Sequence, residues 1–179
     1  MRKKLLDLFC GAGGCAVGYA AAGFDVTGVD IRPQPRYPYR FLQADALDFP
    51  LDDFDVVHAS PPCQAYSICQ NFLQRPDAYP DLLAVVRQKL LTWGGVWVIE
   101  NVPGAPMQQG VMLCGSMFGL GVLRHRYFEA STVLFAPAPC QHQGSVKDGT
   151  YISVFGKGGR GFTRERGGRA MGIDWMTVK

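Results

Sequence analysis

Short apolar runs recur along the first two thirds of the chain and predict its main strands and helices. Residues 5–9, 54–59 and 96–99 form nearly continuous apolar runs, which are typical of strands buried within a sheet. Residues 81–92 instead place apolar side chains at three- and four-residue steps, and residues 15–22 also read as a helix. The run over 96–99 fits the centre of a parallel sheet.

The rest of the pattern is weaker. Further short strands are predicted at 25–30, 41–46, 112–115 and 123–129. From residue 136 the composition shifts to Pro, Gly, Ser and Arg. The basic, glycine-rich segment 157–169 suits a loop that lies along phosphates, with disorder as a nearly equal alternative.

The charge is uneven along the chain. A chain of 179 residues can bury a core without disulfides. Residues 1–123 carry 9 Lys+Arg against 11 Asp+Glu (−2), whereas residues 124–179 carry 9 against 4 (+5). The basic part predicts a polyanionic partner, although a solvated basic surface explains it equally well. We expect a core over 1–135 and a basic, Gly/Arg-rich C-terminal region over 136–179.

The sequence also bears on the cellular compartment. No apolar run approaches the roughly 18 residues of a membrane span. The basic start resembles that of a signal peptide, but Asp7 interrupts the apolar run that follows. We expect a cytoplasmic protein whose six cysteines are reduced.

A glycine-rich loop over 10–14 connects the first strand to the first helix. This order predicts a nucleotide-binding loop, because bare backbone can approach a ligand at the helix N-terminus. Asp30 ends the next strand and is placed to bind ribose hydroxyls. Asp45 could reach an adenine amino group or simply cap the next turn. The loop predicts a nucleoside cofactor without separating nicotinamide enzymes from S-adenosylmethionine enzymes.

Cys63 and Glu100 are candidate chemical groups at strand ends. Two prolines stop the strand over 54–59, and Cys63 follows on a loop at the carboxyl edge, where α/β folds bind ligands. Many free cysteines are merely buried, so Cys63 alone decides little. Glu100 follows a buried strand, where an unpaired carboxylate is costly, and this favours a functional role.

Cys140 and His142 form a Cys-x-His pair that superficially resembles a pair of metal ligands. No second pair lies at the spacing of zinc sites. We therefore expect no metal site.

Four segments, in order, resemble motifs of the DNA (cytosine-5)-methyltransferase family. They are the cofactor motif Asp7–Gly14, the nucleophile motif Pro62-Cys63-Gln64, the acid motif Glu100-Asn101-Val102 and the arginine motif Arg124-x-Arg126, the last preceded by a similar segment, Leu113–Leu120. The resemblance spans roughly residues 5–128. It implies the α/β fold of S-adenosylmethionine-dependent methyltransferases, a Rossmann-like sandwich with a mostly parallel sheet, and a small basic C-terminal lobe.

The resemblance also implies a reaction, namely methyl transfer from S-adenosylmethionine to C5 of cytosine in double-stranded DNA, leaving S-adenosylhomocysteine. Cys63 would add to C6 of a flipped base, and Glu100 would bind N3 and the exocyclic amine. Arg126 would hold the base O2, and Arg124 would orient Glu100. The implied cofactor-binding residues are Phe9, Gly11, Gly13, Gly14, Asp30, Ile31, Asp45, Ala46 and Pro61. The implied substrate-binding residues are Pro62, Gln64, Ser67, Asn101, Arg160 and Arg164.

The chain departs from the family after the paired arginines. Family members usually continue with a target-recognition domain and a last motif, whereas 51 residues follow Phe128 here, and residues 172–175 resemble only the segment before that motif. We expect a compact phage- or bacterium-like enzyme, a shortened chain, or half of a split enzyme with a complementary C-terminal chain; a homo-oligomer is a further option. A tRNA (cytosine-5) methyltransferase and a non-catalytic DNA-binding fragment remain alternatives.

Overall fold

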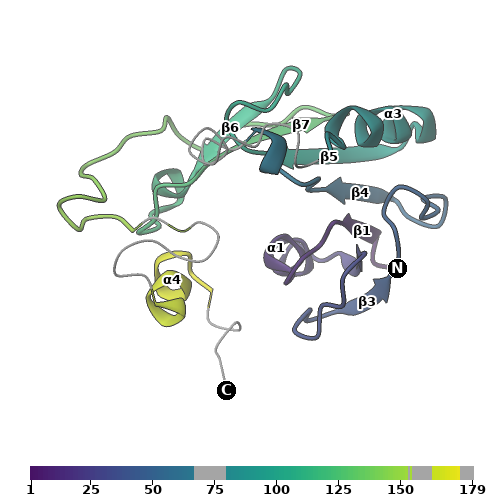
Figure 1. The fold of residues 1–179 in the computed structure, drawn as a ribbon, viewed down its shortest axis with the longest axis horizontal. Helices are drawn as coiled ribbons and strands as arrows, with labels where there is room; N and C mark the ends of the chain where they lie inside the picture. Colours follow the sequence, from purple (N-terminus) through teal and green to yellow (C-terminus); the bar gives the residue numbers. More distant parts are fainter. Residues whose placement is uncertain (67–79, 153, 155–162, 174–179) are drawn as a thin grey trace. The chain divides into compact units, whose positions relative to one another are not determined.

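The computed structural model (Figure 1) describes residues 1–66, 80–152, 154 and 163–173. None of the helices in these ranges is both long and apolar enough to cross a membrane. Ser67 and Arg160, two of the predicted substrate-binding residues, lie outside the described residues.

The described strands form one sheet in the order β3-β2-β1-β4-β5-β7-β6. Their bounds are β1 Lys4–Leu8, β2 Asp25–Asp30, β3 Arg40–Gln43, β4 Val56–Ala59, β5 Val96–Asn101, β6 Val111–Cys114 and β7 His125–Ala130. The β1–β2, β1–β4, β2–β3 and β4–β5 pairs are all parallel. The predicted α/β fold with a mostly parallel sheet is confirmed.

Three α-helices lie among the described residues. They are α1 Gly14–Ala21, α3 Leu83–Trp93 and α4 Arg164–Ala170. Short 3-10 turns follow the nucleophile segment (η1, Gln64–Tyr66) and β6 (η2, Gly115–Phe118). Helix α3 ends at Gly94, whose positive φ of 76° suits a residue without a Cβ.

The hydrophobic core joins the central strands to α3. Leu6, Val57 and Ile99 come from β1, β4 and β5 and are completely buried. Leu83, Val86 and Leu90 of α3 belong to the same apolar cluster. Their spacing of three and four residues gives α3 one buried face. The sequence pattern predicted the helix, but its apolar Val85 lies on the exposed face.

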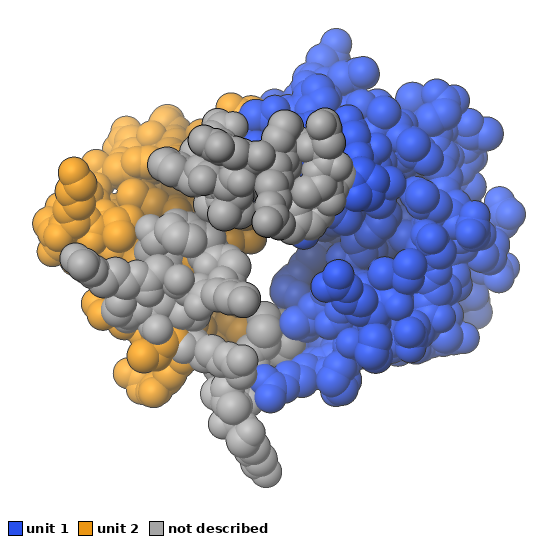
Figure 2. Space-filling view, in the orientation of Figure 1, with its two compact units in different colours: residues 1–110, 128–134 blue, residues 111–127, 135–179 orange. Residues whose placement is uncertain are grey.

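The chain divides into two compact units, which Figure 2 distinguishes by colour. Unit 1 contains residues 1–110 and 128–134, and unit 2 contains residues 111–127 and 135–179. The segment 111–127, which the sequence analysis grouped with the catalytic core, thus belongs with the C-terminal residues. Hydrophobic periodicity could not reveal this grouping, because it describes single elements and not the contacts between them.

The prediction of a loop over 157–169 was wrong for its last part, because helix α4 begins at Arg164. Thr163 caps the helix by accepting a hydrogen bond from the Arg166 backbone N–H at 3.1 Å. Glu165 and Arg169 form an ion pair one turn apart, at 2.7 Å. These local interactions offset part of the low helix propensity of the two glycines within α4.

Candidate active site

The predicted cofactor, nucleophile and acid segments follow strands that end at the same edge of the sheet. In the parallel register Leu8 pairs with both Val29 and Ala59, and Ala59 pairs with Ile99. The residues that follow these positions therefore meet at the carboxyl edge, where parallel α/β folds bind ligands. We call this region of unit 1 the carboxyl edge.

The glycine-rich loop turns sharply as it leaves β1. Phe9, Gly11 and Gly13 all have positive φ angles, of 57°, 50° and 89°. A Cβ added to Gly13 would lie 2.8 Å from the Pro38 ring, so only glycine fits there. Gly14 then begins α1. The turn brings bare backbone to the start of a helix, as the sequence predicted.

Asp30 holds this loop in place. Its Oδ2 accepts a hydrogen bond from the Gly11 N–H at 3.1 Å, and its Oδ1 accepts one from the Arg32 N–H at 2.9 Å. A carboxylate can accept about four hydrogen bonds, so both oxygens retain capacity for hydroxyl donors. The neighbouring Ile31 side chain is 64% exposed, which leaves an apolar surface beside the carboxylate.

Asp45 takes the structural role that the sequence analysis kept as an alternative. Its Oδ1 accepts a hydrogen bond from the Leu47 N–H at 2.9 Å and so caps the turn after β3. Ala46 is buried among the core residues. Its methyl group therefore belongs to the core, and a contact between Ala46 and a ligand would use its backbone.

The nucleophile and acid segments are joined by a hydrogen bond. The buried Asn101 side chain donates from Nδ2 to the Pro61 carbonyl at 3.2 Å. Cys63 lies two residues beyond Pro61, is partly exposed, and accepts a backbone bond from Tyr66 at 3.1 Å through its carbonyl. This hydrogen bond lets Asn101 position the loop, and the predicted contact of Asn101 with substrate stays a prediction.

Glu100 precedes Asn101 within β5 and is partly exposed. Because side chains alternate along a strand, the carboxylate of Glu100 points to the face opposite the Asn101 amide. The sequence analysis placed Glu100 after the strand, but the strand continues through it. Pro62 and Gln64 flank Cys63 on the same loop, Pro62 partly buried and Gln64 exposed.

The paired arginines belong to unit 2. Arg124 donates from Nη1 to the Val154 carbonyl at 2.9 Å, and Arg126 donates from Nη1 to the His125 carbonyl at 2.7 Å. Arg164 is the first residue of α4, in the same unit.

A buried polar cluster lies beneath the carboxyl edge, and the sequence analysis did not detect it. Asp7 accepts a hydrogen bond from the Tyr37 hydroxyl at 3.2 Å, and burial raises the pKa of Asp7 to about 7. His58 bonds to Tyr19 at 3.1 Å and to Ser60 at 2.9 Å, and burial lowers its pKa to about 4. Asp7 belongs to the cofactor motif. The buried layer next to the glycine loop therefore contains two ionisable groups, Asp7 and His58.

A buried ion pair in unit 1 was also missed. Arg87 of α3 donates from Nε and Nη2 to both carboxylate oxygens of Glu129, at 2.7 and 2.9 Å. The Gln108 N–H donates to the same carboxylate at 2.8 Å, and Arg87 also donates to the Pro106 carbonyl at 2.9 Å. The ion pair joins α3 to β7, and the bonds to Pro106 and Gln108 hold the chain after β5 beside it. Apolar periodicity along the chain does not predict a contact between an arginine and a glutamate that lie 42 residues apart in the sequence.

Comparison with known proteins finds similarity to methyltransferases, in sequence over part of the chain and in fold. No family model matches the chain. It is 30% identical over 129 residues to the type II methyltransferase M.AquIA of Picosynechococcus sp., a match that covers 58% of this chain and 50% of that protein. The chain thus spans about half the length of the curated relative that it matches.

Solved structures support the fold. One is described as a DNA modification methyltransferase encoded within an E. coli prophage (TM-score 0.52, 23% identity, 70% of this chain and 45% of that one). Another is the Dnmt2 methyltransferase of S. pombe (TM-score 0.53, 17% identity, 83% of this chain and 53% of that one). These structures confirm the predicted methyltransferase fold, and the match to M.AquIA agrees with the resemblance that the sequence motifs indicated.

Proposed function

We propose that this chain carries the catalytic part of a DNA methyltransferase that transfers a methyl group from S-adenosylmethionine to C5 of cytosine. The observation that carries the proposal is the convergence, at one carboxyl edge, of the glycine loop, Asp30, Cys63 and Glu100. The similarity to M.AquIA supports DNA as the substrate.

The residues at the carboxyl edge fit S-adenosylmethionine. Asp30 offers carboxylate oxygens to the ribose hydroxyls, and the exposed side chain of Ile31 offers an apolar surface to the adenine ring. Phe9 and the glycine loop offer the tightly turned backbone at the start of α1. When bound, the cofactor supplies an electrophilic methyl group.

In the proposed chemistry, the chain's own residues make C5 of cytosine nucleophilic. The Cys63 thiolate adds to C6 of a base flipped out of the duplex and forms a carbon–sulfur bond. Glu100 bonds to N3 and the exocyclic amine and offsets the charge that this addition pushes into the ring. After methylation, loss of the C5 proton to a base restores the double bond and expels Cys63 as the thiolate. The family resemblance assigns catalytic roles to Arg124 and Arg126.

Labelled methyl transfer tests this proposal. The chain is incubated with labelled S-adenosylmethionine and either unmodified genomic DNA or tRNA, and the methylated nucleoside is identified by mass spectrometry. We expect 5-methylcytosine from DNA. N4-methylcytosine, N6-methyladenine or label in tRNA alone would contradict the proposal.

A mechanism-based trap keeps the test informative when turnover is low. In DNA containing 5-fluorocytosine, the fluorine at C5 cannot leave as a proton does, so Cys63 stays bonded to C6 after methyl transfer. We expect a denaturation-resistant protein–DNA adduct with the native chain and none with Cys63→Ala. Calorimetry should give the same S-adenosylmethionine affinity for both proteins. An adduct that persists in Cys63→Ala would exclude Cys63 as the nucleophile.

A further inference from the structure

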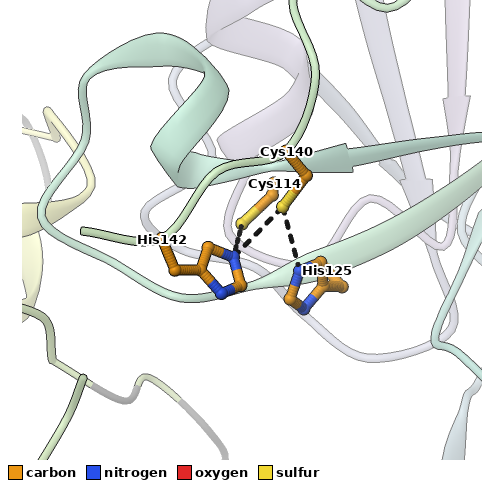
Figure 3. Close-up of side chains that lie close together, drawn as sticks. All are labelled: Cys114, His125, Cys140 and His142. Carbon is orange, nitrogen blue, oxygen red and sulfur yellow. Dashed lines mark hydrogen bonds between the residues drawn. The ribbon is translucent and has the colours of Figure 1, made fainter. Parts of the chain in front are cut away.

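Unit 2 brings together four side chains with metal-binding chemistry, which Figure 3 shows pointing toward one another. We call Cys114, His125, Cys140 and His142 the Cys/His cluster. Their ligand atoms all lie within 4.8 Å of one another. Cys114 ends β6, His125 begins β7, and Cys140 and His142 lie on the segment that follows β7. From this cluster we infer that unit 2 holds a structural zinc ion, a site that the proposed methyl-transfer chemistry does not use.

The distances within the cluster match the edges of a zinc tetrahedron. With Zn–S bonds of about 2.3 Å and Zn–N bonds of about 2.0–2.1 Å, a tetrahedral ion separates sulfur from nitrogen by about 3.5 Å. The Cys140 Sγ lies 3.4 Å from the His125 Nε2 and 3.1 Å from the His142 Nε2. The Cys114 Sγ lies 3.5 Å from the same His142 nitrogen. His142 therefore presents Nε2 to both sulfur atoms, and His125 presents Nε2 to the Cys140 sulfur.

The types of ligand atom in the cluster indicate zinc in a structural role. Two thiolates and two imidazoles are a common ligand set of structural zinc sites. All four tetrahedral positions would be filled by protein atoms, so no position is left for water or substrate. On binding, each of the two thiols gives up its proton to solvent, and the two thiolates neutralise the charge of Zn²⁺.

The surroundings of the cluster support a metal site. The Ser116 hydroxyl donates to the Cys114 sulfur at 3.4 Å and lies 3.8 Å from the Cys140 sulfur, as groups that orient metal ligands do. Gly115 packs directly against the Val122 backbone, and a Cβ at Gly115 would clash there. This close approach brings Cys114 next to the segment that leads into His125.

The distribution of apolar residues gives an independent reason for a metal. Both hydrophobic clusters found among the described residues lie in unit 1. In the described part of unit 2, the fully buried apolar side chains are Cys114 and Val122. A small unit with so little buried apolar surface usually requires a disulfide or a metal ion to stay folded. The zinc ion supplies that restraint by joining β6, β7 and the segment over 140–142.

Metal analysis of the full chain tests the inference. The protein is purified under reducing conditions without chelator, and zinc is quantified by mass spectrometry. We expect one zinc ion per chain, lost in Cys140→Ser and His142→Ala. Cys63→Ser, a cysteine variant in unit 1, serves as the matched control and should retain its zinc. Because these measurements do not depend on methyl transfer, they separate this inference from the proposed function.

Cobalt substitution and a rescue variant test the ligands directly. The Co²⁺-loaded chain should show thiolate-to-cobalt charge transfer and the intense visible bands of a tetrahedral site. His142→Cys should still bind one metal ion, with stronger charge transfer from a third thiolate. If the variants fail to fold, chelation of the native chain followed by Zn²⁺ titration gives the same information. Absence of zinc with no uptake of added Zn²⁺, a Cys114–Cys140 disulfide in the native chain, or equal zinc loss in Cys63→Ser would overturn the inference.

Discussion

The carboxyl edge of unit 1 and the Cys/His cluster of unit 2 are organised in opposite ways. At the carboxyl edge, the functional residues follow strands whose order and register are fixed by a large apolar core. In unit 2, the described residues contribute little apolar burial, and the cluster itself connects the elements. The first site depends on its fold, whereas in the second the fold depends on the site. Perturbing one region should therefore leave the other largely unchanged.

The largest expected effect is the response of unit 2 to zinc removal. Structural zinc contributes on the order of 10 kcal/mol to the folding of small metal-dependent units. Chelation should abolish hydrogen-exchange protection in β6 and around His125, while α3 and β5 keep theirs. Protection lost equally in both units would show that the two regions are not independent.

Cys63→Ala should have the next largest effect, because removing a covalent nucleophile costs about three orders of magnitude in rate or more. The assay is labelled methyl transfer under saturating S-adenosylmethionine. The same variant should keep its full zinc content and an unchanged thermal midpoint of unfolding. A transfer rate within tenfold of the native rate would exclude the proposed covalent mechanism.

Glu129→Gln should destabilise unit 1 by about 3 kcal/mol, because it leaves the buried Arg87 guanidinium without its charged partner. Chemical denaturation monitored by tryptophan fluorescence measures the change. The matched control is Glu165→Gln, which breaks an exposed pair with Arg169 (side chains 72% and 80% exposed) and should cost almost nothing. Equal losses in the two variants would mean that burial does not strengthen the Arg87–Glu129 pair.

The buried polar cluster beneath the glycine loop predicts a pH dependence of the free energy of unfolding. The folded-state pKa of Asp7 is raised to about 7 from 3.8, so the folded chain binds more protons between these values and stability falls as pH rises. The pKa of His58 is lowered to about 4 from 6.5, so stability rises with pH across that interval. The two contributions oppose each other.

Asp7→Asn removes the contribution of Asp7 to this pH dependence and leaves that of His58. Between pH 4 and 6.5 its free energy of unfolding should rise more steeply with pH than that of the native chain, by up to about 1.4 kcal/mol per pH unit. Urea titrations at several pH values measure the slope. Asp52→Asn, at an exposed position, is the control. The same slope in Asp7→Asn and the native chain would show that Asp7 is ionised in the fold at low pH.

The smallest expected effect is that of Ser116→Ala. Loss of the hydroxyl donor to the cysteine sulfurs should weaken zinc affinity about tenfold without releasing the ion at high zinc concentration. Competition with a chromophoric chelator measures the affinity. Methyl-transfer activity at saturating zinc should not change. A zinc affinity equal to that of the native chain would show that the Ser116 hydroxyl does not stabilise the bound ion.

The carboxyl edge could be predicted from the sequence because its residues lie in short contiguous motifs. Each motif follows an apolar run, and parallel strands bring their carboxyl ends to one edge whatever the loops between them. The role of Asn101 was not visible in the same way. Its hydrogen bond to Pro61 depends on the adjacency of β4 and β5, which residue spacing alone does not specify.

The Cys/His cluster could not be predicted by the same reasoning. Cys140 and His142 are neighbours in the sequence, but their partners Cys114 and His125 stand alone, each inside a segment that resembles a different motif. Cys114 and His125 lie 11 residues apart and His125 and Cys140 lie 15 apart, and these separations indicate no site until β6 and β7 lie side by side in the sheet. The expectation of no metal site rested on spacing along the chain, and such spacing does not reveal ligands that only the fold brings together.

The sequence by itself determined the parallel α/β core, the glycine loop and the positions of Cys63 and Glu100 at strand ends, because these follow from local periodicity and local motifs. Only the tertiary structure decided which distant side chains meet. It paired Arg87 with Glu129, enclosed Asp7 and His58 in a polar cluster, and gathered four single ligands around one point. The physical reason is that burial and short-range bonding depend on distances in space, which strand order fixes and sequence separation does not.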